Sequence, residues 1–308
     1  MMQTWVDRLI EHQPWLEPIA DLVQSLVGRA FDVLGRPGQS LKSLLHGTRT
    51  GHPLHPALTD VPIGAWIGGV VADAVAHFTT RLPSTAGDVM LAVGLVCGLA
   101  AIITGYTDFH ETNGHERRVA VAHGLLMTVA MLVAAVSLGL RWWAGMEWHP
   151  LAVGLAAAAL GILLRGAYLG GHLVFAIGTT VNHLAFISWP TDFVTVGDAA
   201  DFPEGKLRRA DADGVGVLVV RRSGTLYGIA EVCGHAGGPL AQGTLDGMVV
   251  TCPWHGSRFC VDSGRPQRGP ATFPQPTFTV REQDGTVSVK VGPPTKAGGL
   301  AELAPEPQ

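Results

Sequence analysis

Two long stretches without a charged residue constrain the fold of this chain more than any other feature. One lies between Asp88 and Asp108, and the other lies between Arg118 and Arg141. A helix needs about 20 residues to cross a hydrocarbon core of roughly 30 Å, and each stretch is long enough. We therefore predict that both stretches are membrane-spanning helices.

Two further apolar segments raise the predicted number of spans to four. One is Val61–Phe78, and the other begins near Pro150. The composition agrees, since 47% of residues are hydrophobic, 15% are charged and the mean hydropathy is +0.28. Charge this sparse is typical of a chain that lies partly in lipid. A short fifth span ending at Pro190 is the alternative, although glycines interrupt that segment.

Lysine and arginine residues are concentrated on one side of the predicted spans. On that side lie Arg29, Arg36, Lys42, Arg49, Arg117 and Arg118. The opposite loops offer only Arg81 and Arg141. Because cytoplasmic loops carry the excess of cationic residues, we expect a cytoplasmic N-terminus. Four spans return the chain to the same side, so we expect a multi-pass protein of the bacterial inner membrane with a cytoplasmic C-terminal domain.

Residues 1–50 form a separate N-terminal helical segment in this prediction. Apolar residues follow helical spacing over residues 15–34. Trp5 and Trp15 suit the depth of lipid headgroups, which favours an interfacial helix on the membrane surface. An amphipathic helix packed on protein explains the spacing equally well, and the sequence leaves both possibilities open.

The composition changes near residue 192. Short β-type runs appear, and Ser223-Gly224, Asp246-Gly247 and Asp284-Gly285 separate them as hairpin turns. We therefore predict an α + β two-domain protein: a transmembrane helical bundle over 51–190 and a small all-β domain over 192–292. The composition of residues 293–308 is typical of a disordered tail. The formal net charge of −4 gives no indication of nucleic-acid binding.

Four potential metal ligands stand in two matching pairs within the β region. Cys233 and His235 form a C-x-H pair, sixteen residues follow, and Cys252 and His255 form a C-x-x-H pair. In a [2Fe-2S] centre of this type, two thiolates bind one iron and two imidazoles bind the other. Zinc also takes this donor set, but a zinc finger places its two histidines together on a helix. Here Cys and His alternate within glycine-rich loops.

The sequence around these pairs closely resembles the Rieske ferredoxin family. The resemblance covers about 100 residues and implies an antiparallel β-domain with two hairpin loops around one [2Fe-2S] cluster. Glycines let the backbone approach the inorganic sulfurs, and a proline stiffens the second loop. The resemblance also implies a serine in the second loop and a third loop, at Gly269-Pro270, that shields the cluster. The expected cofactor-binding residues are Gly234, Gly237, Pro253, Gly256, Ser257 and Pro270.

Two departures from related proteins bear on the redox properties. Rieske subunits of cytochrome bc complexes have two additional cysteines that join the cluster loops, and here Gly238 and Trp254 occupy those positions. Phe259 replaces a tyrosine of those subunits, so one hydrogen-bond donor near the sulfurs is lost. The domain therefore resembles the lower-potential ferredoxin type. Its expected partners are proteins of a redox chain, a reductase and an oxidase or oxygenase, together with the lipid bilayer.

An oxygenase reaction within this chain is not expected. Rieske domains also open the large subunits of ring-hydroxylating oxygenases, which need a second domain with a 2-His-1-carboxylate iron site. Only 53 residues follow His255, and none of them is a histidine.

The hydrophobic half carries histidines that need an explanation. Residues 51–64, GHPLHPALTDVPIG, resemble the entry motif of a bacterial membrane-domain family whose function is not established. Ionisable groups at membrane depth are costly, which makes His55, His123 and His172 functional candidates. Three interpretations remain open: they cap helices and bond backbone carbonyls, they line a quinone or proton site, or two of them ligate a b-type haem.

Two functions follow from these observations. In the first, the chain is a membrane-anchored Rieske protein that transfers single electrons between redox partners. In the alternative, the helical domain binds a quinone or haem b and exchanges electrons with the cluster, so that the chain is an oxidoreductase module.

Overall fold

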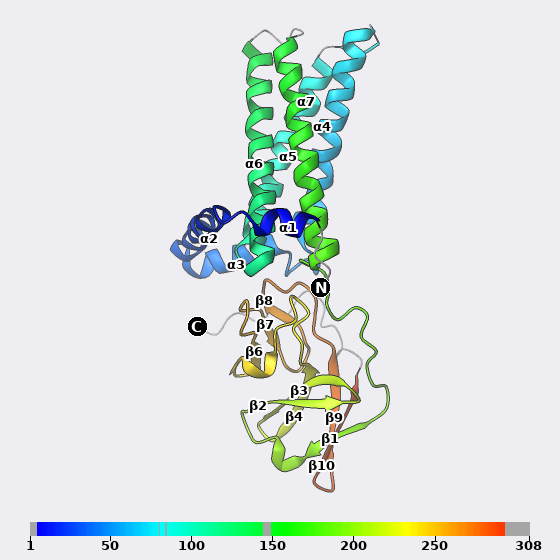
Figure 1. Cartoon of the computed structure of the whole chain (residues 1–308). Helices are drawn as coiled ribbons and strands as arrows, with labels where there is room; N and C mark the ends of the chain where they lie inside the picture. Colours follow the sequence, from blue (N-terminus) through cyan, green and yellow to red (C-terminus); the bar gives the residue numbers. More distant parts are fainter. Residues whose placement is uncertain (1–4, 80, 84, 144–148, 293–308) are drawn as a thin grey trace. The chain divides into compact units, whose positions relative to one another are not determined.

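The computed structural model describes residues 5–79, 81–83, 85–143 and 149–292 (Figure 1). The predicted disordered tail, residues 293–308, lies outside the described part. The chain divides into two compact units, residues 1–180 and residues 181–308. The second unit therefore includes a short segment before the change of composition at 192.

Four long helices make up most of the first unit. They are α4 (Leu54–Phe78), α5 (Thr85–Phe109), α6 (Gly114–Trp143) and α7 (Pro150–His172), which continues into a π-helical turn, η1 (Leu173–Ile177). All four are long and apolar enough to cross a membrane, and the described residues include no fifth such helix. The prediction of four spans is confirmed. The first of these four helices, α4, begins at Leu54, seven residues before the predicted start of the span at Val61.

Small residues bring the four helices close together. Trp66 of α4 packs with Leu91 of α5 in one buried cluster. The same cluster includes Ala130 and Ala134 of α6, each fully buried. Because an apolar solvent gives helices no hydrophobic reason to associate, close van der Waals packing over such small residues stabilises the bundle.

One end of the bundle contains a buried cluster of three charges. Arg141 donates to both carboxylate oxygens of Asp73, at 2.9 and 2.6 Å, and to Asp88 Oδ1 at 2.7 Å. All three side chains are at most 4% exposed. Arg141 was expected in a loop, whereas it lies in the last turn of α6. Bidentate pairing of this kind is what allows a guanidinium to remain charged away from water.

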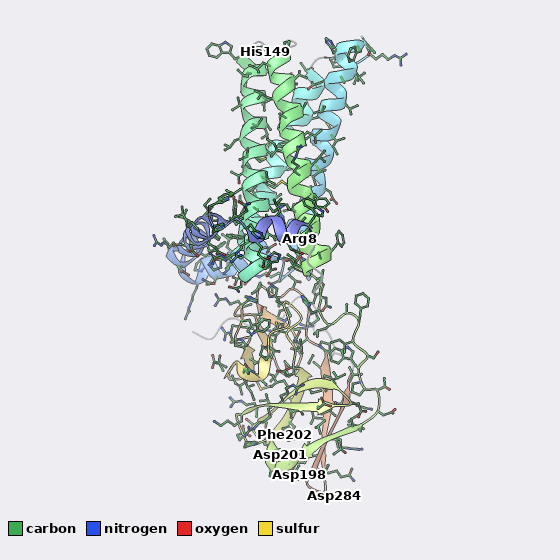
Figure 2. All side chains as sticks on the ribbon, in the orientation of Figure 1. Arg8, His149, Asp198, Asp201, Phe202 and Asp284 are labelled. Atoms are coloured by element: carbon green, nitrogen blue, oxygen red, sulfur yellow. The ribbon has the colours of Figure 1, made fainter. Side chains whose placement is uncertain are left out.

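At the same end, a histidine begins the fourth span. His149, labelled in Figure 2, accepts a hydrogen bond from the backbone N–H of Ala152 at 3.3 Å. Pro150 occupies the first helical position, where a missing N–H costs nothing. These local features define where α7 starts.

Three shorter helices precede the bundle: α1 (Trp5–Glu11), α2 (Leu16–Val33) and α3 (Gly35–His46). Val6, Ile10 and Leu16 are buried in a cluster that includes Phe109 and Val119 of the bundle. The following large hydrophobic side chains within residues 5–46 are exposed: Trp5, Leu9, Trp15, Leu22, Leu26, Val33, Leu34, Leu41 and Leu44. The segment therefore packs on protein with one face and presents a second apolar face, as an interfacial helix does.

Ion pairs join these helices to the bundle. Arg117 pairs with Glu17 and Asp21, and Arg118 pairs with Glu17. Arg117 and Arg118, which contribute to the predicted cationic side of the membrane, thus also hold α2 against the start of α6.

A second polar cluster fixes α3 to the end of α5. His46 Nδ1 lies 2.7 Å from Asp108 Oδ1, and Lys42 pairs with Glu111. Burial raises the pKa of Glu111, but the hydrogen bond from His110 and the charge of Lys42 outweigh it and lower the pKa to about 2. Glu111 therefore stays ionised, which keeps this contact intact through the neutral pH range.

The second unit consists of two antiparallel sheets. The larger has the order β1-β10-β9-β4-β3-β2 and the smaller has the order β5-β6-β7-β8. The strands of the larger sheet are β1 (Val194–Asp198), β2 (Leu207–Ala212), β3 (Val215–Arg222), β4 (Thr225–Ala230), β9 (Thr277–Gln283) and β10 (Thr286–Val291). Those of the smaller sheet are β5 (Thr244–Asp246), β6 (Val249–Thr251), β7 (Arg258–Cys260) and β8 (Pro266–Arg268).

Two-residue turns connect the hairpins of the larger sheet, as predicted. Ser223-Gly224 and Asp284-Gly285 both have positive φ at both positions, as a type I′ turn requires (Asp284 is labelled in Figure 2). A third such turn, Asp213-Gly214, joins β2 to β3 and was not singled out from the sequence. The all-β architecture of this unit is confirmed.

The charge cluster leads to a prediction about stability. Arg141→Ala leaves two carboxylates buried without their cation, and we expect it to destabilise the bundle by about 3–5 kcal/mol. Thermal denaturation of the detergent-purified protein, followed by size-exclusion chromatography, measures the effect. Arg165→Ala is the matched control, since Arg165 lies on an exposed surface of α7.

Adding Asp73→Asn and Asp88→Asn to Arg141→Ala should recover part of the lost stability, because it removes the two unpaired carboxylates. Equal stabilities for Arg141→Ala and Arg165→Ala would contradict the prediction.

Candidate metal centre

The first of the two ligand loops follows β4 and contains Cys233 and His235. The backbone N–H of Cys233 donates to Gly238 O, and the N–H of Gly237 donates to Cys233 O, both at 2.8 Å. Gly237 has a φ of +81°, a conformation that a side chain would strain. The loop is thus closed on itself around the cysteine.

The second loop joins β6 to β7 and repeats this arrangement. The backbone N–H of Cys252 donates to Ser257 O at 2.8 Å, and the N–H of Gly256 donates to Cys252 O at 3.1 Å. Gly256 has a φ of +71°, so the glycine again occurs where the backbone requires it. Two loops far apart in sequence therefore present a cysteine in the same local geometry.

The two thiols meet between the loops. They share a hydrogen bond that raises the pKa of Cys233, which burial raises further, and lowers the pKa of Cys252 to about 6. Backbone N–H groups of His235 and Ala236 face the sulfur of Cys233, and those of Trp254 and His255 face the sulfur of Cys252. N–H donors of this kind stabilise a thiolate, whether free or bound to iron.

The two imidazoles also lie together. The ring centres of His235 and His255 are 5.1 Å apart, with an angle of 83° between the planes. Two imidazoles bound to one tetrahedral metal ion at about 2.0–2.1 Å have ring centres roughly 5 Å apart. The structure therefore separates the four side chains into a pair of sulfurs and a pair of imidazoles, as the donor set of a [2Fe-2S] centre with Cys₂ and His₂ irons requires.

A buried glutamine supports the first loop and was missed from the sequence. Gln275 is 2% exposed. Its Oε1 accepts from the backbone N–H of Gly234 at 3.0 Å, and its Nε2 donates to Val232 O at 2.8 Å and Ala230 O at 3.2 Å. One amide thus connects the end of β4 to the ligand loop. Because the partners lie more than forty residues apart, no local sequence pattern reveals this role.

Ser257 joins the second loop to a third loop. The backbone N–H of Ala271 donates to Ser257 Oγ at 3.0 Å, and the serine is fully buried. Ala271 directly follows Gly269-Pro270, the segment expected to shield the cluster. The predicted serine and proline therefore lie in loops that are bonded to each other.

The positions of the missing cysteine pair are in contact. A Cβ atom on Gly238 would lie 3.1 Å from Cγ of Trp254 and 2.7 Å from Sγ of Cys252. The indole of Trp254 therefore lies against Gly238, at the two positions where the Rieske subunits of cytochrome bc complexes have the additional cysteines. Phe259 is fully buried in the same cluster of side chains as Cys233 and Cys252.

The three membrane histidines do not gather at one place. His55 and His123 line a cavity inside the bundle, whereas His172 does not. His172 Nε2 bonds Asp7 Oδ1 at 2.9 Å, and His115 Nε2 bonds the same oxygen at 2.8 Å. His172 therefore holds α1 on the bundle.

Fold and site together define an iron–sulfur protein with a helical membrane domain. The family described as Rieske [2Fe-2S] domain matches residues 192–279, and the family described as Predicted membrane protein (DUF2231) matches residues 51–183. The Rieske domain binds a [2Fe-2S] cluster.

Similar proteins are ferredoxins of dioxygenase systems. Ferredoxin CarAc of Metapseudomonas resinovorans is 39% identical over 92 residues, which is 30% of this chain and 86% of that protein. The 3-phenylpropionate/cinnamic acid dioxygenase ferredoxin subunit of Escherichia coli K12 is 33% identical over 91 residues, 29% of this chain and 85% of that protein. The C-terminal part of this chain thus places it in the Rieske ferredoxin family.

Solved structures of such ferredoxins also match. One is the complex of reduced oxygenase and oxidized ferredoxin in carbazole 1,9a-dioxygenase, with 35% identity, a TM-score of 0.31, and coverage of 32% of this chain and 92% of that one. Another is the ferredoxin of carbazole 1,9a-dioxygenase from Nocardioides aromaticivorans IC177, with 28% identity, a TM-score of 0.32, and coverage of 33% and 100%.

The packing around the sulfurs predicts the reduction potential. With Phe259 in place of a hydroxyl donor, we expect the cluster near the low end of the roughly −150 to +300 mV Rieske range. Phe259→Tyr should raise the midpoint, because a hydroxyl that donates to a cysteine sulfur stabilises the reduced cluster. Redox titration of the purified protein measures both, and Phe193→Tyr serves as a control outside this cluster of side chains. A wild-type midpoint in the upper half of the range would refute the argument.

Proposed function

We propose that this chain is a membrane-anchored one-electron carrier that receives electrons from a reductase and delivers them to an oxygenase or oxidase. The observation that carries the proposal is the combination of a ferredoxin-type Rieske domain with four apolar helices in one chain. One relative is named as a ferredoxin, and another is named as the ferredoxin subunit of a dioxygenase. Membrane attachment would restrict such a carrier to partners at the bilayer.

We further propose that Cys233 and Cys252 ligate one iron and that His235 and His255 ligate the other. The adjacent thiols and the 5.1 Å spacing of the imidazoles support this assignment. The cluster, when bound, would take up and pass on one electron at a time. The protein supplies N–H donors to the sulfurs and a dry, rigid setting, since both cysteines are at most 3% exposed.

The residues around the ligands have supporting roles in this proposal. Gly234, Gly237 and Gly256 let the loops approach the cluster, and Pro253 stiffens the second loop. Ser257 and Pro270 belong to the bonded pair of loops that would cover the cluster. Ser257 alone among them has a side chain of the kind that reacts with substrates, and it is fully buried and bonded to Ala271, so the proposed role is electron transfer without bond chemistry.

The ligand assignment is tested by removing one ligand from each pair. We expect Cys252→Ser and His255→Ala to abolish the Rieske EPR signal of dithionite-reduced membranes, because both would bind iron directly. The same variants should lose reduction of cytochrome c by NADH in the presence of a ferredoxin reductase from a dioxygenase system.

Cys260→Ser is the matched control, since Cys260 lies in β7 and its thiol donates to Asp262. It should keep both the EPR signal and the cytochrome c activity. An intact Rieske signal in Cys252→Ser or His255→Ala would end the ligand assignment. Wild-type protein with a cluster that accepts no electron from the reductase would instead refute the carrier role.

We also propose that the protein resides in the bacterial inner membrane with the Rieske domain in the cytoplasm. Arg29, Arg36 and Arg49 precede the first span, and Arg117 and Arg118 begin α6. The opposite loops offer Arg81, and Arg141 lies buried in the last turn of α6. This excess of cationic residues on the side of the N-terminus supports the proposed orientation.

Reporter fusions after Gln308 test this orientation. With four spans and a cytoplasmic N-terminus, a green fluorescent protein fusion should fluoresce and an alkaline phosphatase fusion should be inactive. The same reporters after Arg81 should give the opposite pair of results. Active phosphatase and no fluorescence at the C-terminus would place the Rieske domain outside.

A further inference from the structure

We propose that the helical bundle binds one b-type haem, ligated axially by His55 and His123. The proposal goes beyond the electron-carrier function and does not depend on it. It rests on the placement of two imidazoles, on the cavity that surrounds them and on a repeated local structure in the two halves of the bundle.

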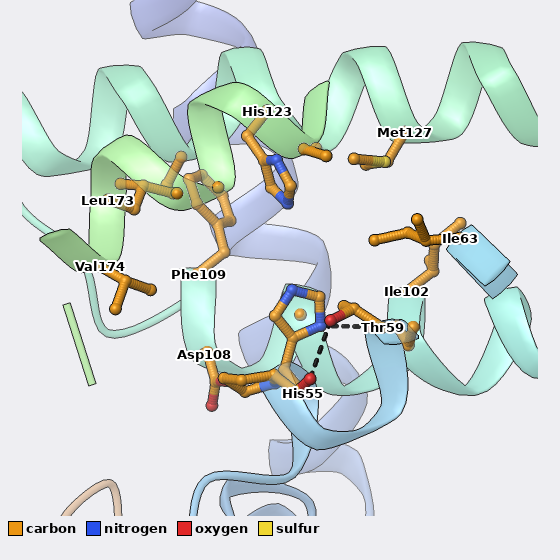
Figure 3. A pocket seen from close by; sticks show the side chains of 18 of the residues that line it. His55, Thr59, Ile63, Ile102, Asp108, Phe109, His123, Met127, Leu173 and Val174 are labelled. Carbon is orange, nitrogen blue, oxygen red and sulfur yellow. Dashed lines mark hydrogen bonds between the residues drawn. The ribbon is translucent and has the colours of Figure 1, made fainter. Parts of the chain in front are cut away.

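The two imidazoles face each other across the bundle (Figure 3). His55 comes from α4 and His123 from α6, and their ring centres lie 6.1 Å apart. Two imidazoles that bind one metal ion from opposite sides, at about 2.0–2.1 Å, place their ring centres roughly 6.3 Å apart. The spacing therefore suits axial ligation and differs from the closer pair formed by His235 and His255.

Hydrogen bonds determine which nitrogen each ring presents. His55 Nδ1 lies 2.8 Å from Ala101 O, and His123 Nδ1 lies 2.8 Å from Gly166 O. Since a carbonyl only accepts, both Nδ1 atoms carry a proton, and Nε2 is the nitrogen that each ring has available for a metal. Metal-ligating histidines are usually held in this way. A quinone carbonyl, by contrast, needs donors.

A cavity of about 510 Å³ surrounds the two rings. This volume lies within the range of roughly 300–1,000 Å³ that is usual for cofactor sites. Its walls are largely apolar and include Ile63, Met127 and Val174. It lies entirely within the first unit, between the spans.

A bare metal ion would need further ligands from the protein. Among the described residues, the only group of three or more candidate ligands close enough to share an ion is Asp7, His115 and His172. In the part of the chain that the structure describes, no third donor of that kind joins His55 and His123. A porphyrin brings its own four nitrogen donors and an apolar ring, which suits two opposed imidazoles in an apolar cavity.

The two helical hairpins, α4–α5 and α6–α7, hold their histidines in the same way. In the first hairpin, His55 of α4 bonds Ala101 O of α5, and Gly105 follows four residues later. In the second, His123 of α6 bonds Gly166 O of α7, and Gly170 follows four residues later. A Cβ atom on Gly105 would lie 2.8 Å from Cε1 of His55, and one on Gly170 would lie 3.1 Å from Cε1 of His123. Each imidazole thus lies against a glycine of the neighbouring helix, and the site falls between two equivalent halves.

The experiment is performed on the full-length protein, expressed with added δ-aminolevulinate and purified in detergent. We expect about one haem per chain by the pyridine haemochromogen assay and a low-spin ferric EPR signal. His55→Ala and His123→Ala should each reduce the haem content at least tenfold. His172→Ala is the matched control and should retain haem, because His172 bonds Asp7 outside the cavity.

Two further measurements separate loss of a ligand from loss of folding. The Rieske EPR signal should persist in all variants, and imidazole added to His55→Gly or His123→Gly should restore the low-spin signal. The proposal is overturned if wild-type protein binds no haem, even after titration with hemin. It is also overturned if the two alanine variants bind haem as wild type does, or if solvent extraction recovers a quinone from the cavity in place of haem.

Discussion

A hydrocarbon environment offers no water, and the helical half of this protein is organised by that constraint. Every polar group that lies among the spans has to find its partner within the chain. Arg141 is accepted only because Asp73 and Asp88 both bind it. His55 and His123 are tolerated because a carbonyl of the neighbouring helix accepts a hydrogen bond from Nδ1 of each ring. The same requirement explains why the spans approach closely over small residues, since these partners must lie within hydrogen-bond distance.

The Rieske unit meets a related constraint with different means. The proposed ligands are two buried cysteines and two half-buried histidines, and a single strand edge cannot present all four. Two loops with the same internal hydrogen bonds each provide one cysteine and one histidine. In each loop, backbone N–H groups face the sulfur of that loop's cysteine. Gln275 and Ser257 then connect these loops to the rest of the domain through buried hydrogen bonds. Without a covalent link between the loops, the packing of Trp254 against Gly238 and these bonds hold the site together.

The proposed carrier differs from a free ferredoxin, because its two units are joined in one chain. A diffusing ferredoxin meets its partners in three dimensions, whereas attachment to a bilayer confines the encounter to one surface and raises the effective concentration of membrane-bound partners. A haem in the bundle would add a second one-electron centre of different chemistry to the same chain. The apolar outer face of α2, with Leu22 and Leu26 exposed, is consistent with a chain that contacts lipid beyond its four spans.

Much of this organisation is determined by the sequence alone, because it depends on local composition. Apolar stretches of sufficient length predict four spans, turn pairs such as Ser223-Gly224 predict hairpins, and the spacing of Cys233, His235, Cys252 and His255 indicates the class of metal centre. Contacts between distant residues were decided only by the tertiary structure. Three contacts show this: Arg141 is buried between two aspartates, Gln275 supports Gly234, and His55 pairs with His123 rather than with His172. The residues of each contact lie between about forty and seventy positions apart in the sequence. No periodicity encodes such pairs, since which side chains meet depends on how whole helices and loops pack.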